Sequence, residues 1–127
     1  MASMKTNRRQ RKEMPRRFQV RPRLYCGRDI AIGPGKADLL EAIRKAGSIA
    51  AAAESMGMSY MRAWMLIQTM NGCFKAPLVQ TKRGGAERGT AILTETGRTV
   101  LALYRRIEAR SLKATQADQK QLSEQLR

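Results

Sequence analysis

Histidine is absent from this sequence of 127 residues, and cysteine and acidic residues are scarce. Without histidine, the chain cannot build a Ser-His-Asp or Cys-His catalytic group or a histidine-ligated metal site. Two cysteines are too few for a zinc site made of cysteines alone, or for a small fold held by several disulfides. The sequence also offers no paired carboxylates in an apolar setting and no nucleophile beside a base. We therefore predict a protein that is not an enzyme and that has no catalytic residue, metal or cofactor.

Long apolar segments are also missing. The longest stretch without a formal charge covers residues 63–74, whereas a membrane-spanning helix needs about 20 mostly apolar residues. No apolar segment follows the basic N-terminus, so no secretory signal is expected. We predict a cytoplasmic protein without a membrane partner, in which Cys26 and Cys73 stay reduced. Two ordinary thiols partly in the core are the favoured interpretation of this pair, and a redox switch is the alternative.

Basic residues far outnumber acidic ones: 25 Lys and Arg stand against 10 Asp and Glu, a net charge of +15. This imbalance predicts a polyanionic partner, nucleic acid first and an anionic membrane second. Residues 1–23 alone hold nine basic residues and one acidic residue. Because residues 1–22 have almost no apolar content, they are expected to form a basic arm that is disordered on its own. The arm is either a tail that seeks phosphates or a solubilising extension, and the basic remainder of the chain favours the tail.

One folded domain is expected over residues 23–113. Hydrophobic residues make up 43% of the chain, which lets a single domain of this length bury a core. Residues 114–127 form a polar tail rich in glutamine. The sequence leaves open whether this tail extends the preceding helix or frays.

Two short strands and a helix are predicted at the start of the domain. Apolar residues at 24–26 and 30–32 flank a glycine turn, which is typical of a small hairpin. A Gly-Pro-Gly sequence at 33–35 then breaks the chain. Apolar residues recur at helical spacing up to Gly47, which is expected to be a left-handed cap. This helix is predicted to be a support element.

The following residues predict a helix-turn-helix. Ser48 is a suitable N-cap for a short helix over 49–56, and Ser59 for a longer helix from Tyr60 to about Gly72. Gly57 between them accepts the positive φ that such a turn needs. An ordinary pair of helices in a bundle is the alternative, because glycine turns between helices are common.

A β-hairpin is predicted directly after the second of these helices. Residues 77–82 and 90–93 are typical of strands, and a glycine-rich loop joins them. A phosphate-binding P-loop is disfavoured, because Gly89-Thr90 lacks the lysine that this motif requires. Thr94 is expected to cap a long helix with an apolar stripe made of Val100, Leu101, Tyr104 and Ile107. The predicted fold class is mainly α with a small β component: a winged helix-turn-helix with a β-hairpin wing and a long C-terminal helix.

The second helix of a helix-turn-helix lies in the major groove of DNA with its N-terminal residues toward the base edges. Arg62 is the only formal charge between Tyr60 and Phe74, and an arginine in the first turn can form two hydrogen bonds with guanine. Ser59 and the first N–H groups of the helix suit a phosphate. A period of 3.6 residues places on the inward side Ala63, Ile67, Met70 and Phe74, with Trp64 beside them as a core residue rather than a stacking platform.

Side chains that this period turns outward are the candidate DNA contacts. Tyr60 is equally compatible with a phosphate contact and with the core. Met61 and Met65 either contact thymine methyl groups or are simply exposed. The candidate DNA-binding residues are Ser59, Tyr60, Met61, Arg62, Met65, Gln68 and Thr69 on the helix and Lys82, Arg83 and Arg88 on the wing.

An ordered set of sequence motifs over about residues 23–110 resembles the N-terminal DNA-binding domain of the ModE family. The motifs are Ile30 to Leu40, Gly47-Ser48-Ile49, Ala51-Ala52-Ala53, Gly57-Met58-Ser59-Tyr60, Ala63-Trp64, Met70-Asn71, and the late Gly-Gly loop followed by Leu93-Thr94 and Gly97. ModE proteins are molybdate-responsive, LysR-like winged helix regulators of bacteria and archaea. The resemblance implies a homodimeric regulator that binds double-stranded DNA, with helices outside the helix-turn-helix forming the dimer. Because only a short polar tail follows Arg110, molybdate is not expected as a ligand.

Three functions follow from these observations. The leading hypothesis is a transcriptional regulator, associated with the nucleoid, that reads double-stranded DNA as a homodimer. An architectural DNA-binding protein without sequence specificity is the alternative, because the charge alone could supply its binding. An RNA-binding protein is disfavoured, because the six aromatic residues are few and most are expected to be buried.

Overall fold

The structure, a computed structural model, describes residues 17–82 and 89–127. It divides into two compact units. The larger unit is the chain from Arg21 to Ala109, and the smaller one combines the residues up to Val20 with Arg110–Arg127.

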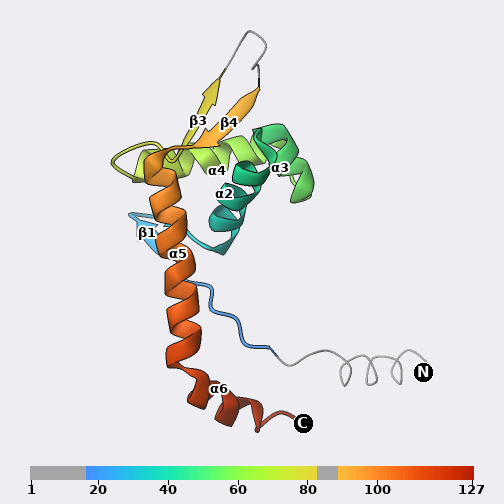
Figure 1. The fold of residues 1–127 in the computed structure, drawn as a ribbon, viewed down its shortest axis with the longest axis vertical. Helices are drawn as coiled ribbons and strands as arrows, with labels where there is room; N and C mark the ends of the chain where they lie inside the picture. The colour runs from blue at the N-terminus through green and yellow to red at the C-terminus, as the bar shows by residue number, and fades with distance from the viewer. Residues whose placement is uncertain (1–16, 83–88) are drawn as a thin grey trace, which may run out of the picture. The chain divides into compact units, whose positions relative to one another are not determined.

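Helices dominate the described chain, and two antiparallel hairpins accompany them (Figure 1). The mainly α fold class with a small β component is thereby confirmed, and the tail that the sequence left open is helical over most of its length. The elements are β1 (Leu24–Cys26), β2 (Asp29–Ile32), α2 (Pro34–Ala46), α3 (Ile49–Ser55), α4 (Tyr60–Cys73), β3 (Val79–Lys82), β4 (Thr90–Leu93), α5 (Glu95–Ala114) and α6 (Gln116–Ser123).

Serine side chains begin the two helices of the helix-turn-helix, as predicted. The Oγ of Ser48 accepts a hydrogen bond from the N–H of Ala51, and the Oγ of Ser59 accepts one from the N–H of Arg62, both at 3.1 Å. Gly57 in the turn has a φ of 67°, a left-handed conformation that glycine adopts without a steric penalty. Local sequence therefore fixes where α4 starts.

The core of the larger unit is formed mainly by α2, α3 and α4. Leu39, Leu40 and Ile43 of α2 are fully buried. The predicted inward stripe of α4 is confirmed: Ala63, Ile67 and Met70 are buried, and Trp64 and Phe74 are half-buried and pack against the same cluster. Burial of this stripe turns the opposite side of α4 to solvent.

The N-terminus of α5 is held on the chain segment before β3. Thr94 caps the helix as predicted, because its Oγ1 accepts a hydrogen bond from the N–H of Gly97 at 3.0 Å. The same hydroxyl donates to the carbonyl of Pro77 at 2.6 Å, and the N–H of Thr94 donates to the carbonyl of Leu78 at 2.9 Å. A Cβ on Gly97 would lie 2.1 Å from the carbonyl oxygen of Leu78. The close approach of the two segments therefore requires glycine.

Several element boundaries differ from the predictions. α2 begins at Pro34, because proline suits the first helical turn, where an N–H would have no partner within the helix. α3 ends at Ser55, one residue before the predicted Met56. β3 begins at Val79 rather than Pro77, because proline has no N–H to donate to the strand ladder.

Ile107 corrects the predicted apolar stripe of α5, since it is 51% exposed. The core contacts of this helix end at Tyr104, which is buried and donates its hydroxyl to the carbonyl of Pro22 at 2.9 Å. Ile107 lies almost one turn beyond that point. The helical period correctly places Ile107 on the same side of α5 as Leu101 and Tyr104. It is exposed because the core of the larger unit ends before it.

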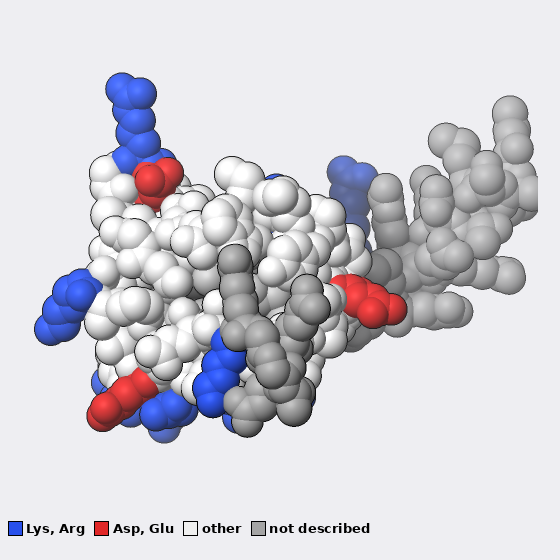
Figure 2. All heavy atoms as spheres, turned by 90° about the horizontal axis from the view of Figure 1, so that it is seen from above, with Lys and Arg blue, Asp and Glu red and all other residues white. Residues whose placement is uncertain are grey.

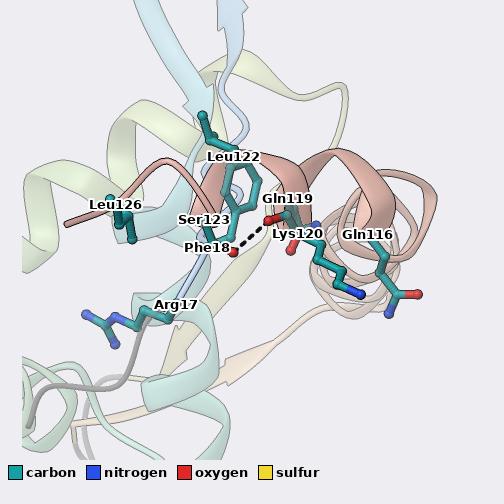
Figure 3. Close-up of a pocket in the computed structure, with 8 residues that line it drawn as sticks. All are labelled: Arg17, Phe18, Gln116, Gln119, Lys120, Leu122, Ser123 and Leu126. Atoms are coloured by element: carbon teal, nitrogen blue, oxygen red, sulfur yellow. Dashed lines mark hydrogen bonds between the residues drawn. The ribbon is translucent and has the colours of Figure 1, made fainter.

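The smaller unit contains α6 and an open hollow (Figure 3). The hydroxyl of Ser123 in α6 donates to the carbonyl of Lys120 at 2.8 Å. The lining residues are Arg17, Phe18, Gln116, Gln119, Lys120, Leu122, Ser123 and Leu126. No helix in the described part of the chain has the length and apolar character needed to cross a membrane.

Candidate nucleic-acid interface

The outer side of α4 presents the side chains that the helical period turned outward. Tyr60, Met61 and Met65 are 51%, 62% and 57% exposed, and Arg62 and Gln68 are exposed as well. Exposure of Tyr60 contradicts the alternative that it belongs to the core. The structure thus places one cation, two methionines, one aromatic ring and one amide on the exposed side of the same helix.

Thr69 lies at the edge of this surface. Its side chain is half-buried, and its hydroxyl donates a hydrogen bond to the carbonyl of Met65 at 3.0 Å. The hydroxyl oxygen keeps lone pairs that can accept from a ligand. Of the residues predicted on α4, Thr69 is therefore the least available to a partner.

The N-terminus of α4 favours an anion. Its first turn contains no acidic residue, and the first N–H groups of any α-helix have no partner within the helix. One of these N–H groups is capped by Ser59, whose own hydroxyl hydrogen stays available as a donor. The partial positive charge of the helix dipole adds to that of Arg62.

The β3–β4 hairpin projects away from the helices of the larger unit (Figure 1). Lys82 is exposed at the end of β3 and pairs with Thr90 in the strand register. Gln80 pairs with Ile92, so these four side chains share one face of the hairpin. Arg83 and Arg88, the other two cations predicted on the wing, lie outside the described residues.

Asn71 joins the hairpin to α4, a role that the sequence analysis did not find. Its Oδ1 accepts hydrogen bonds from the N–H groups of Leu78 at 2.8 Å and Val79 at 3.4 Å, and its Nδ2 donates to the carbonyl of Val79 at 3.4 Å. The N–H of Ala91 in β4 bonds to the carbonyl of Gly47 at 2.8 Å. The hairpin is thus tied to the C-terminal end of α4 and to the end of α2, which fixes its base relative to both helices.

Charge is distributed unevenly on the face that carries the hairpin. Seen from above, most of the area that the grey atoms leave visible is uncharged, and most of the Lys, Arg, Asp and Glu side chains in view lie toward its margin (Figure 2). The acids of α2 are paired, since Asp38 binds Arg105 at 2.9 Å and Glu41 binds Arg44. Partial burial lowers the pKa of Arg105, but hydrogen bonds with Asp38 and Glu108 outweigh it and raise the pKa overall. Arg105 is therefore committed to ion pairs within the chain.

Among the described residues, no group of three or more His, Cys, Asp or Glu side chains comes together. The chemistry available on this face is hydrogen bonding, cationic attraction and apolar contact.

The sequence matches the family model described as bacterial regulatory helix-turn-helix protein, lysR family, over residues 36–98. Similar curated proteins include the molybdenum-pterin-binding protein MopB of Rhodobacter capsulatus and the molybdenum transport protein ModE of Azotobacter vinelandii. Each is 40% identical over 92 residues, which are 72% of this chain and 34% of the relative. The DNA-binding transcriptional dual regulator ModE of Escherichia coli strain K12 is 38% identical over 71 residues, 56% of this chain and 27% of the relative. The chain thus spans about a third of the length of these relatives.

Solved structures show the same fold. The CbnR_DBD–DNA complex matches with a TM-score of 0.54 and 21% identity over 72% of this chain and 97% of that chain. VV2_1132, described as a LysR family transcriptional regulator, matches with a TM-score of 0.52 and 20% identity over 72% of this chain and 30% of that chain. The predicted winged helix-turn-helix is confirmed by this similarity of fold.

Proposed function

Residues 36–98 of this chain belong to the lysR family of bacterial regulatory helix-turn-helix proteins and are similar to ModE proteins, and from this we propose that the chain binds double-stranded DNA and regulates transcription. The observation that carries the proposal is the exposed outer side of α4, which has one charged side chain, Arg62, and no acid in its first turn. A major groove of about 12 Å admits an α-helix, and its base edges and flanking phosphates suit this surface.

In this proposal the exposed side chains of α4 and its N-cap either read base edges or hold phosphates. Arg62 donates two hydrogen bonds to the O6 and N7 of a guanine, and Met61 and Met65 contact thymine methyl groups. Gln68 pairs with an adenine through its amide. Ser59 and Tyr60 donate hydrogen bonds to phosphate oxygens, which position the helix without reading sequence.

The wing and the arm would add phosphate contacts. Lys82, together with Arg83 and Arg88, would lie along the backbone or in the minor groove beside α4. The basic residues of 1–22 would contribute affinity without sequence specificity, because each neutralised phosphate releases counterions. We expect the protein to be associated with the nucleoid.

We further propose that the regulator is a homodimer. Leu103 and Ile107 of α5 are 47% and 51% exposed, and residues four apart lie on the same side of a helix. Packing this pair against a second copy would remove apolar surface from water and supply driving force. A two-fold dimer would place its α4 helices about 34 Å apart, one turn of DNA.

The proposal is tested by letting the full chain select from sheared genomic DNA and sequencing what it retains. A shared, two-fold symmetric sequence with half-sites about one helical turn apart is expected. Enrichment without any shared sequence would replace the regulator by an architectural protein. Contrary to the expectation that most aromatic residues are buried, three are exposed: Phe18 at 46%, Tyr25 at 61% and Tyr60 at 51%. Unpaired bases stack on exposed aromatic side chains. Competition with single-stranded RNA in the same assay therefore tests RNA binding.

A chain without residues 1–21 separates the contribution of the arm from that of α4. Its affinity should fall on selected and random DNA alike, and the dependence of affinity on salt should become shallower, because fewer counterions are released. Titrations at several salt concentrations measure both quantities. An unchanged slope would show that the arm does not contact DNA.

A further inference from the structure

The two cysteines meet in the fold although 47 positions separate them. Cys26 lies in β1 and is exposed, and Cys73 is the last residue of α4 and is half-buried. The thiol of Cys26 donates a hydrogen bond to the carbonyl of Cys73 at a sulfur–oxygen distance of 4.0 Å. The sulfur of Cys26 therefore lies beside the backbone of Cys73, so the two cysteines are neighbours in space.

The fold holds this pair in place. β1 pairs with β2, with Cys26 opposite Asp29, and Ile32 of β2 packs in the same core cluster as Met70 of α4. Gly27, with a φ of 61°, allows the tight turn between the two strands. Core packing thus brings the β1–β2 hairpin and the C-terminal end of α4 together, with Cys26 on the hairpin and Cys73 on the helix.

We propose that Cys26 and Cys73 form a reversible intramolecular disulfide, with a small-molecule disulfide such as glutathione disulfide as the oxidant. The thiolate of Cys26, the more exposed sulfur, attacks one sulfur of the oxidant, and its S–S bond breaks to release one small thiol. Cys73 then loses its proton to water, and its thiolate attacks the Sγ of Cys26. The second small thiol leaves. Two protein thiols are oxidised, and one small disulfide is reduced to two thiols.

The surroundings of Cys73 change the pKa of its thiol. The pKa of Cys73 is raised, chiefly by the neighbouring Cys26 thiol, then by desolvation and by the negative charge of Asp29, while Lys36 lowers it. Fewer Cys73 thiols are therefore deprotonated at neutral pH, so a higher pH should speed the second attack, which needs the Cys73 thiolate.

The disulfide would fasten the β1–β2 hairpin to the C-terminal end of α4. That end lies about 21 Å along the helix from Ser59 and about 17 Å from Arg62, so the outer side of the first turn of α4 would stay uncovered. Closing a loop of this length restricts the unfolded chain and should stabilise the folded one. Formation of this disulfide involves the two thiols alone and does not depend on DNA binding.

The test uses the full chain, reduced and then equilibrated with glutathione disulfide. Intact mass should fall by two hydrogen atoms, maleimide should find no free thiol, and a peptide map without reductant should show the Cys26 and Cys73 peptides joined. The midpoint of thermal unfolding should rise by about 10 °C, and dithiothreitol should return it to its starting value.

Two single variants complete the test. Cys26→Ser changes an exposed residue and should keep the fold, while Cys73→Ala avoids placing a hydroxyl in a half-buried position. Neither should show the oxidant-dependent rise in unfolding midpoint. A wild-type chain that keeps both thiols free, retains only mixed disulfides, or forms disulfides only between two copies would overturn the proposal. Because every readout is chemical or thermal, failure to bind DNA would leave the result unaffected.

Discussion

Arg62 combines two features that set it apart among the residues of α4: it is the only charged side chain of this helix, and its backbone N–H is already held by the Ser59 cap. The cap fixes the first turn, so the guanidinium extends from a backbone of defined geometry. A cation held in this way reads a base more selectively than one on a mobile loop, because less conformational freedom is lost on binding.

We predict that Arg62→Ala weakens binding to the selected DNA site by about 1–3 kcal/mol and changes binding to random DNA little. The reason is that a bidentate contact with guanine is lost, whereas phosphate contacts remain. Fluorescence titration on both DNAs measures the difference. Arg28→Ala removes the same charge from the exposed turn between β1 and β2 and serves as the matched control. Equal losses on both DNAs for Arg62→Ala would show that it contacts phosphate only.

Gly97 illustrates a residue whose identity is set by a distant neighbour. A methyl group there would clash with the carbonyl oxygen of Leu78, so we expect Gly97→Ala to lower the free energy of unfolding by about 1–3 kcal/mol. Gly72→Ala is the control, because a Cβ at Gly72 meets nothing within 4 Å. That substitution in helix α4 should raise stability by about 0.5–1 kcal/mol. Urea unfolding of both variants checks the opposite signs.

At the scale of elements, the hairpin β3–β4 depends on a side chain of the neighbouring helix. Asn71 of α4 satisfies backbone groups of Leu78 and Val79, and β4 is bonded to the carbonyl of Gly47. The orientation of the wing is thus coupled to the end of α4, and through it to the surface that we propose reads DNA.

We predict that Asn71→Ala destabilises the chain by about 1–3 kcal/mol, because backbone groups of the buried residues Leu78 and Val79 lose their partner. DNA affinity should fall as well, since the base of the wing is no longer fixed beside α4. Asn71→Asp keeps the acceptor oxygen and should lose less stability. Thermal unfolding and DNA titration measure the two effects. Equal losses of stability in both variants would mean that the acceptor bonds do not carry the effect.

At the scale of the whole molecule, the proposed regulator needs a second copy. The exposed pair Leu103 and Ile107 lies on α5, away from α4 in sequence and outside the helix-turn-helix. Because a two-fold dimer uses the same patch on both copies, a charge placed in that patch meets an identical charge.

We predict that the double substitution Leu103→Glu and Ile107→Glu yields a folded monomer, because both residues are exposed in the single chain. Sedimentation equilibrium should show the loss of the dimer, and affinity for a two-fold symmetric DNA site should drop more than affinity for a half-site. Leu122→Glu on α6, where the leucine is 61% exposed, is the control. A dimer that survives the double substitution would place the interface elsewhere.

The sequence by itself determined the elements whose causes are local. Ser48, Ser59 and Thr94 cap the helices that follow them, Gly57 permits the turn, and the 3.6-residue period separates the buried from the exposed sides of α4. These features depend on residues a few positions apart, so a single sequence contains all the information they need.

Only the tertiary structure decided which distant residues meet and where the core stops. The contacts of Cys26 with Cys73, of Gly97 with Leu78, and of Asn71 with the base of the wing each join separate elements. Ile107 has the correct period and remains exposed because the core of the larger unit ends before it. Such outcomes depend on how elements pack in three dimensions, and periodicity along one chain carries no measure of that packing.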